Sequence, residues 1–129
     1  MILLQHIPRD AGFPLADCRT TVDADASGIY VVHDKGTPLY VGMSMHLGKR
    51  LSRAVTSSHH ALPAVYREHP AARVVLLEYP WWELPQDDLS DQQYLARIRW
   101  ALSEVETQAI TFYRPTFNRP PGRPWRQHE

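Results

Sequence analysis

The sequence is poor in cysteine and has no long apolar run. Cys18 is the only cysteine among 129 residues, which excludes an internal disulfide and argues against a cysteine-based zinc site. No stretch approaches the roughly 20 apolar residues that span a bilayer, so we expect no membrane association. The apolar start, Met1 to Leu4, has no basic segment before it and makes a poor signal peptide. These absences predict a cytoplasmic chain, and its length allows one domain.

The sequence also lacks net charge, since 14 Lys and Arg balance 14 Asp and Glu. This excludes bulk electrostatic nucleic-acid binding of the histone kind, but it does not exclude a local patch, because phosphate affinity depends on where cations cluster. Basic residues cluster around Arg50 and in the Arg- and Pro-rich end of the chain. If the protein binds nucleic acid, the residues expected to contact its backbone are Lys49, Arg53, Arg119 and Arg123.

Residues 1–25 are interrupted by Pro and Gly and are interpreted as an extension laid over the domain. Two β-branched and aromatic stretches, 28–33 and 39–42, flank turn-forming residues and predict a β-hairpin. Ser44 is a plausible N-cap for a helix to about Val55. A second helix is expected from about residue 63 to before 70, followed by a buried strand over 73–79.

The last predicted element is a long helix. Ser90 and Gln93 fit a capping box, and Pro115 ends the pattern. Its apolar face comprises Leu95, Ile98, Leu102, Val105, Ala109 and Phe112. The order β-β-α-α-β-α predicts an α/β fold with a small three-stranded, largely antiparallel sheet flanked by helices. We expect an extension over 1–25, a domain over 26–118 and a tail over 119–129.

Three groups of residues give the sequence a resemblance to a known family. They are Gly28, Ile29 and Tyr30; then Tyr40, Val41, Gly42 and Arg50; and, far downstream, Glu106, Ile110, Pro115 and Asn118. In this order and spacing, over about residues 27–118, the chain resembles the GIY-YIG nuclease family. The resemblance implies a metal-dependent endonuclease or nickase that hydrolyses phosphodiester bonds in DNA, leaving 5′-phosphate and 3′-hydroxyl ends.

The chemistry of these side chains suits such a reaction. Glu106 is a natural ligand for Mg²⁺ or Mn²⁺, since Mg²⁺ is commonly held through one or two carboxylates plus water. Arg50 stays protonated and presents a planar fork to phosphate, so it would stabilise charge in the transition state. The alternatives without a catalytic role are that Glu106 is a solvated helix residue and that Arg50 is a surface arginine.

The family resemblance gives roles to the remaining motif residues. Tyr30 would activate the attacking water and Tyr40 would orient water or phosphate. We expect nearby cations to lower the tyrosine pKa from about 10. Asn118 would position the site, and Gly28 and Gly42 would permit close backbone approach. The alternative for both tyrosines is ordinary packing on a sheet.

One position departs from the family pattern. Family members commonly carry a histidine or tyrosine one helical turn beyond the arginine, where this sequence has Ala54. His46, His59 or His60 could take its place from a neighbouring turn or loop. As a metal site, His59, His60 and His69 have poor spacing, and solvated loop histidines are the preferred interpretation.

The sequence leaves three alternatives open. The chain is a DNA nuclease, or a nucleic-acid-binding module that lost its chemistry, or a nuclease for RNA or branched DNA. A single site cuts one strand per encounter, so a double-strand cut needs a homodimer, tandem binding or two nicks. Nothing in the sequence identifies the target.

Overall fold

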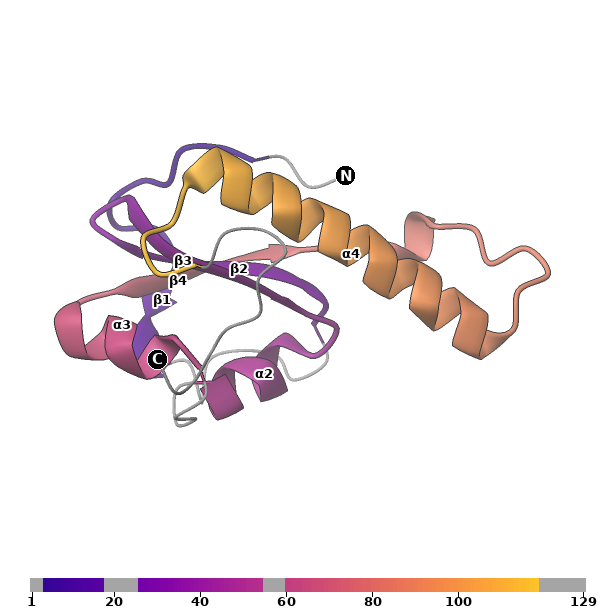
Figure 1. The fold of residues 1–129 in the computed structure, drawn as a ribbon, viewed down its shortest axis with the longest axis horizontal. Coiled ribbons are helices and arrows are strands. Elements are labelled where there is room, and N and C mark those ends of the chain that lie inside the picture. Colours follow the sequence, from indigo (N-terminus) through magenta and orange to yellow (C-terminus); the bar gives the residue numbers. More distant parts are fainter. Residues whose placement is uncertain (1–3, 18–25, 55–59, 119–129) are drawn as a thin grey trace.

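The computed structural model describes residues 4–17, 26–54 and 60–118. Within them the fold is α/β, as predicted, with helices on both faces of one sheet (Figure 1). The elements are β1 (Phe13–Pro14), the 3-10 helix η1 (Leu15–Asp17), β2 (Gly28–Asp34), β3 (Thr37–Ser44), α2 (Leu47–Ala54), α3 (Leu62–Glu68), β4 (Arg73–Glu78), the 3-10 helix η2 (Trp81–Glu83) and α4 (Asp91–Tyr113).

The sheet has four strands in the order β1-β4-β2-β3, and every neighbouring pair is antiparallel. Three of them are the predicted strands. The fourth is the two-residue β1, in which Phe13 pairs with Val74. Its brevity explains why no alternation in the sequence predicted it. The strand brings Leu15, which follows it, into the core at 1% exposure. The domain boundaries proposed from the sequence stay predictions.

Strand β2 lies in the middle of the sheet and is buried on both faces. Because successive strand side chains point to opposite faces, Tyr30 and Val32 join one cluster and Ile29 and Val31 join another. The first cluster packs under α2 and α3, and the second packs under α4 (Figure 1).

Helix α4 begins with the predicted capping box. Ser90 Oγ accepts the N–H of Gln93, and the Gln93 side chain accepts the N–H of Ser90. The predicted apolar face is correct at Ile98, Leu102 and Ala109, which are buried. It is wrong at its two ends, because Leu95 and Phe112 are each 46% exposed. Leu95 belongs to the N-terminal half of α4, which extends beyond the sheet (Figure 1). No described helix has the length and apolarity to cross a membrane.

Candidate functional site

Tyr30 and Tyr40 lie on neighbouring strands and on the same face of the sheet. Tyr30 pairs with Gly42 and Tyr40 pairs with Val32, so the two tyrosines are diagonal neighbours across β2 and β3. Diagonal residues are within reach of each other when their side chains are aromatic. The two ring centroids are 6.0 Å apart. The hairpin register therefore brings the two motif tyrosines together.

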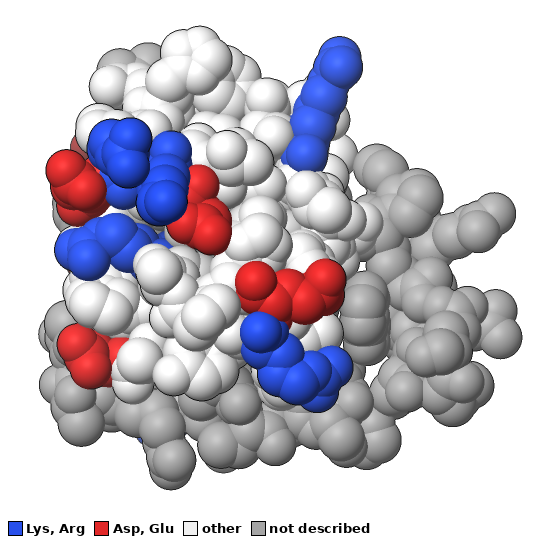
Figure 2. Space-filling view, turned by 90° about the vertical axis from the view of Figure 1, so that its left-hand side faces the viewer, with Lys and Arg blue, Asp and Glu red and all other residues white. Residues whose placement is uncertain are grey.

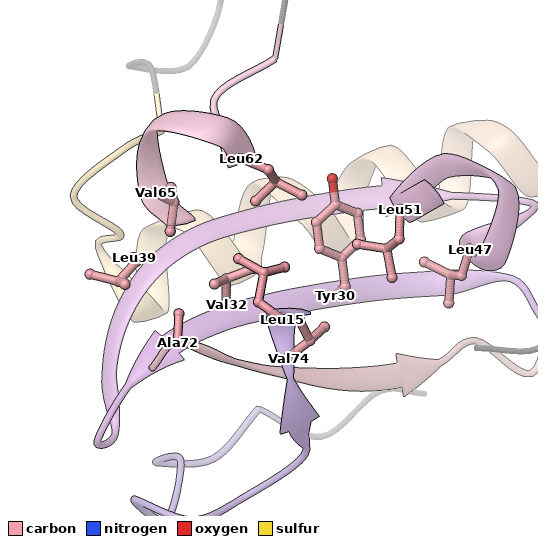
Figure 3. Packing of buried hydrophobic residues seen from close by; sticks show 10 residues of the cluster. All are labelled: Leu15, Tyr30, Val32, Leu39, Leu47, Leu51, Leu62, Val65, Ala72 and Val74. Carbon is pink, nitrogen blue, oxygen red and sulfur yellow. The ribbon is translucent and has the colours of Figure 1, made fainter. Parts of the chain in front are cut away.

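The Tyr30 ring is part of the core. It is fully buried and stands among apolar side chains that include Leu51 and Leu62, and Figure 3 shows its hydroxyl oxygen pointing away from the strand. The ring lies over Gly42. A Cβ at that position would come within 2.3 Å of Tyr30 Cζ and Oη. Gly42 thus gives the ring its space on the sheet.

Gly28 also permits a close approach, in this case of backbone. A Cβ there would lie 2.2 Å from the carbonyl oxygen of Leu77 on β4. The neighbouring motif residues Ile29 and Val41 are fully buried on the opposite face, under α4. The glycines and aliphatic residues of the motif therefore build the sheet that carries the tyrosines.

Arg50 and Glu106 come to the tyrosines from two different helices. Arg50 lies on α2, and its guanidinium lowers the pKa of Tyr30 through its charge and through a hydrogen bond. Glu106 is half-buried and lies on α4, a helix that packs mainly against the edge strand β3. Its negative charge raises the pKa of both Tyr30 and Tyr40. All four predicted side chains thus act on one another electrostatically.

Arg50 lowers the pKa of both tyrosines, as expected, but burial has the larger effect on each. Burial is the largest influence, and it raises the pKa of Tyr30 well above the usual value and that of Tyr40 to about 12. Arg50 opposes this shift without overcoming it. Burial also raises the pKa of Glu106, again against the influence of Arg50. Loss of hydration penalises each charged form, so both phenols hold their protons.

A histidine completes this cluster. His60 Nε2 is 3.4 Å from Tyr30 Oη and 3.3 Å from Tyr40 Oη, and the His60 ring meets the Tyr40 ring edge-on at 5.1 Å. His60 is half-buried, so its interpretation as a solvated loop residue is wrong. The sequence contained a weak signal, namely the polar group missing at Ala54, but nothing in it indicated which histidine would reach the tyrosines.

His69 of that group does not join the site, because it pairs with Asp34 at 2.9 Å. His59 lies outside the described residues. Within residues 4–17, 26–54 and 60–118, no group of three His, Cys, Asp or Glu side chains is arranged to hold a metal ion. A metal at this site would therefore take Glu106 as its carboxylate ligand and would complete its shell with water and substrate oxygens, as Mg²⁺ commonly does.

Asn118 fastens the end of the domain to the edge strand. Its side chain accepts the N–H of Val41 at 2.7 Å and donates to the Val41 carbonyl at 2.8 Å. The N–H of Phe117 is donated to Leu39 O at 2.8 Å. Asn118 thus occupies an open edge of β3 beside Tyr40 and does not contribute its amide to the tyrosine cluster.

Two of the four residues that we expect to contact the nucleic-acid backbone lie in the described part of the chain. Lys49 is exposed on α2, and Arg53 belongs to the same helix. Arg119 and Arg123 lie outside the described residues. On the face shown in Figure 2, acidic and basic side chains adjoin one another, so the described residues there form no surface of a single charge.

Comparisons with known proteins place the fold. No protein-family model matches the sequence, and no curated protein matches it significantly. Among solved structures, the chain resembles the GIY-YIG N-terminal endonuclease domain of UvrC from Thermotoga maritima. The magnesium-bound domain matches with a TM-score of 0.51 at 16% identity, over 81% of this chain and 93% of that one. The chain has the GIY-YIG endonuclease fold.

Point mutants of the same Thermotoga maritima domain, each bound to its catalytic divalent cation, match equally well. A tyrosine-to-phenylalanine mutant gives a TM-score of 0.53 at 15% identity, over 82% of this chain and 96% of that one. An asparagine-to-alanine mutant gives 0.51 at 15% identity, over 81% and 93%. The match covers nearly the whole of that domain, and at this identity it establishes the fold.

Gly42→Ala should destabilise the protein by about 1–3 kcal/mol, because the added methyl group collides with the Tyr30 ring. Urea unfolding measures the change. In a Tyr30→Leu background, which removes the ring atoms concerned, the same substitution should cost clearly less. An equal cost in both backgrounds would contradict this account of the glycine.

Asn118→Ala should lower the free energy of unfolding by about 2 kcal/mol, since it removes two hydrogen bonds and leaves both polar groups of Val41 without this partner. Thr116→Ala, an exposed change in the same segment, is the matched control. If both variants are as stable as the wild type in urea unfolding, Asn118 does not fasten the edge strand.

His60 should make stability depend on acidity. Burial, reinforced by Arg50, lowers the pKa of His60 from 6.5 to about 4. Between these values the unfolded chain binds the proton more readily, so the free energy of unfolding falls as the pH falls from about 6.5 to about 4. Unfolding at pH 7 and pH 4.5 should show a loss on the order of 2 kcal/mol from this residue. His60→Gln should remove that part, and an unchanged loss in the variant would contradict the shift.

Proposed function

We propose that the protein is a divalent-metal-dependent endonuclease that hydrolyses phosphodiester bonds in DNA. The observation that carries this proposal is the meeting of Tyr30, Tyr40, Arg50 and Glu106 on a fold whose solved relatives are endonuclease domains with a bound catalytic cation. The four residues come from β2, β3, α2 and α4. Their meeting is a property of the tertiary structure and not of one local motif.

Glu106 has the chemistry of a site for a hard cation. It is a half-buried carboxylate whose pKa is raised by burial, and Arg50 compensates its charge only in part. A divalent cation would complete that compensation. When bound, Mg²⁺ or Mn²⁺ would supply positive charge next to the phosphate and make a coordinated water more acidic.

Arg50 would bind the phosphate. Its side chain is exposed on α2, and yet its charge acts on Tyr30, Tyr40 and Glu106. A guanidinium in this position can donate two hydrogen bonds to phosphate oxygens. Because it stays protonated, its part in the reaction is to stabilise the negative charge that develops on phosphorus.

Tyr30 and Tyr40 would orient the attacking water, and one of them, as the phenolate, would accept its proton. Both phenols are protonated in the protein alone, because burial opposes the phenolate. Arg50 lowers the pKa of both phenols, and a hydrogen bond lowers it further at each, from Arg50 at Tyr30 and from Tyr30 at Tyr40. The assignment of Tyr30 as the proton acceptor and of Tyr40 as the orienting group therefore rests on the family resemblance.

Supercoiled plasmid DNA with Mg²⁺ or Mn²⁺ tests the proposal. The wild type should produce nicked circles, and EDTA should stop the reaction. Glu106→Gln and Arg50→Ala should each lower the rate by about 10²-fold or more, since each removes charge that stabilises the transition state. Glu104→Gln, an exposed glutamate on the same helix, should behave like the wild type.

Failure to cut linear, nicked, branched and RNA substrates, or equal rates for Glu106→Gln and wild type, would overturn the nuclease assignment. Salt-sensitive DNA binding without cleavage would point instead to a binding module. Nicked circles that precede linear DNA indicate one cut per encounter. A rate of linearisation that rises with the square of protein concentration would indicate a homodimer.

A further inference from the structure

His60 makes three polar contacts that fix its ring. Its Nε2 faces the hydroxyl oxygens of both Tyr30 and Tyr40, at 3.4 and 3.3 Å. Its Nδ1 accepts the backbone N–H of Leu62 at 3.1 Å, at the start of α3. The ring is thus held between the first turn of a helix and the two phenols.

These contacts determine which nitrogen carries the proton. The Leu62 N–H is a donor only, so Nδ1 must present its lone pair to it. A neutral imidazole has one N–H, which leaves the proton on Nε2. The Nε2–H therefore points to the two tyrosine oxygens and is donated to them.

We propose that His60 is a positioning residue that donates its Nε2–H to the hydroxyls of Tyr30 and Tyr40, and that it stabilises whichever tyrosine gives up its proton. It would take the place of the polar side chain missing at Ala54. This inference rests on the proposed nuclease function and adds to it a residue supplied by the segment before α3. The tyrosine releases its proton to solvent, and its phenolate then accepts the proton of the attacking water, so His60 accepts no proton.

The charges around His60 agree with a neutral donor. Tyr30 on β2 and Tyr40 on β3 face Nε2, and Arg50 on α2 repels a second proton on the ring. Burial acts in the same direction, and together they lower the pKa of His60 to about 4. Glu106 on α4 acts on the tyrosines and favours their neutral forms. The donated hydrogen bond opposes that effect, because it stabilises the phenolate.

The tautomer is measurable without DNA or metal. Long-range ¹H–¹⁵N NMR of the full chain, with His60 assigned by comparison with His60→Gln, should show a neutral ring protonated at Nε2 from pH 5.5 to 8. A ring protonated at Nδ1, or one that titrates in this range, would overturn the proposal. This result does not depend on whether the protein cleaves DNA.

Kinetics test the role of the donor. Glutamine keeps a neutral N–H donor but cannot accept a proton, so His60→Gln should retain activity within about threefold. His60→Ala should lose about 10–100-fold, the equivalent of a hydrogen bond to a charged group. In the alanine variant the rising limb of the pH–rate profile should also move to higher pH. His69→Gln, which alters a histidine paired with Asp34, is the matched control and should leave the profile unchanged.

The outcomes separate the two proposals. If His60→Gln is as slow as His60→Ala while Glu106→Gln is inactive, the nuclease assignment stands and His60 is not a donor. If no protein cleaves DNA but the Nε2–H tautomer is found, the hydrogen bond stands and the nuclease assignment fails.

Discussion

The packing of the Tyr30 ring against Gly42 is the contact on which both the fold and the site depend. The ring is fully buried in the cluster beneath α2 and α3, while its oxygen reaches His60 at the border of that cluster. A smaller residue would leave a cavity there, and a Cβ on Gly42 would displace the ring. One side chain thus connects the hydrophobic core to the polar site, and core packing sets the position of the phenol.

The rest of the fold brings polar and charged groups to that phenol from both sides of the sheet. The hairpin supplies Tyr40 through its register, α2 supplies Arg50, and α4, on the opposite face, supplies Glu106. Asn118 fastens the segment after α4 to the same edge. The edge strand β3 therefore carries Tyr40, packs against helices of both layers and is joined along its edge by Asn118.

The sequence predicted the parts of this arrangement that depend on local pattern. The hairpin, the capping box and the buried positions Ile98, Leu102 and Ala109 follow from turn chemistry and periodicity, and the structure confirms them. The short strand β1 and the exposure of Leu95 depend on which segments meet in three dimensions, and no local pattern carries that information. For the same reason the sequence named three histidines as substitutes for the group missing at Ala54, and the structure places His60 against the tyrosines. The sequence predicted that Arg50 lowers the tyrosine pKa, but it did not predict the larger opposite effect of burial, because a motif contains neighbouring charge and does not contain burial.

Burial also determines what the protein's side chains can do before substrate arrives. It holds Tyr30 and Tyr40 protonated, keeps His60 neutral and opposes the charge on Glu106, while Arg50 remains charged.

A buried phenol with its proton in place is a poor base. In the proposed reaction, the base must therefore appear only when added positive charge offsets the dehydration of the phenolate. Arg50 already lowers the pKa of both phenols, and the proposed Nε2–H of His60 would donate to the oxygen that carries the charge, so both groups would stabilise the phenolate as it forms. In the proposed enzyme, such a site would stay inactive until cation and phosphate are both bound, because its low hydration opposes the phenolate until then.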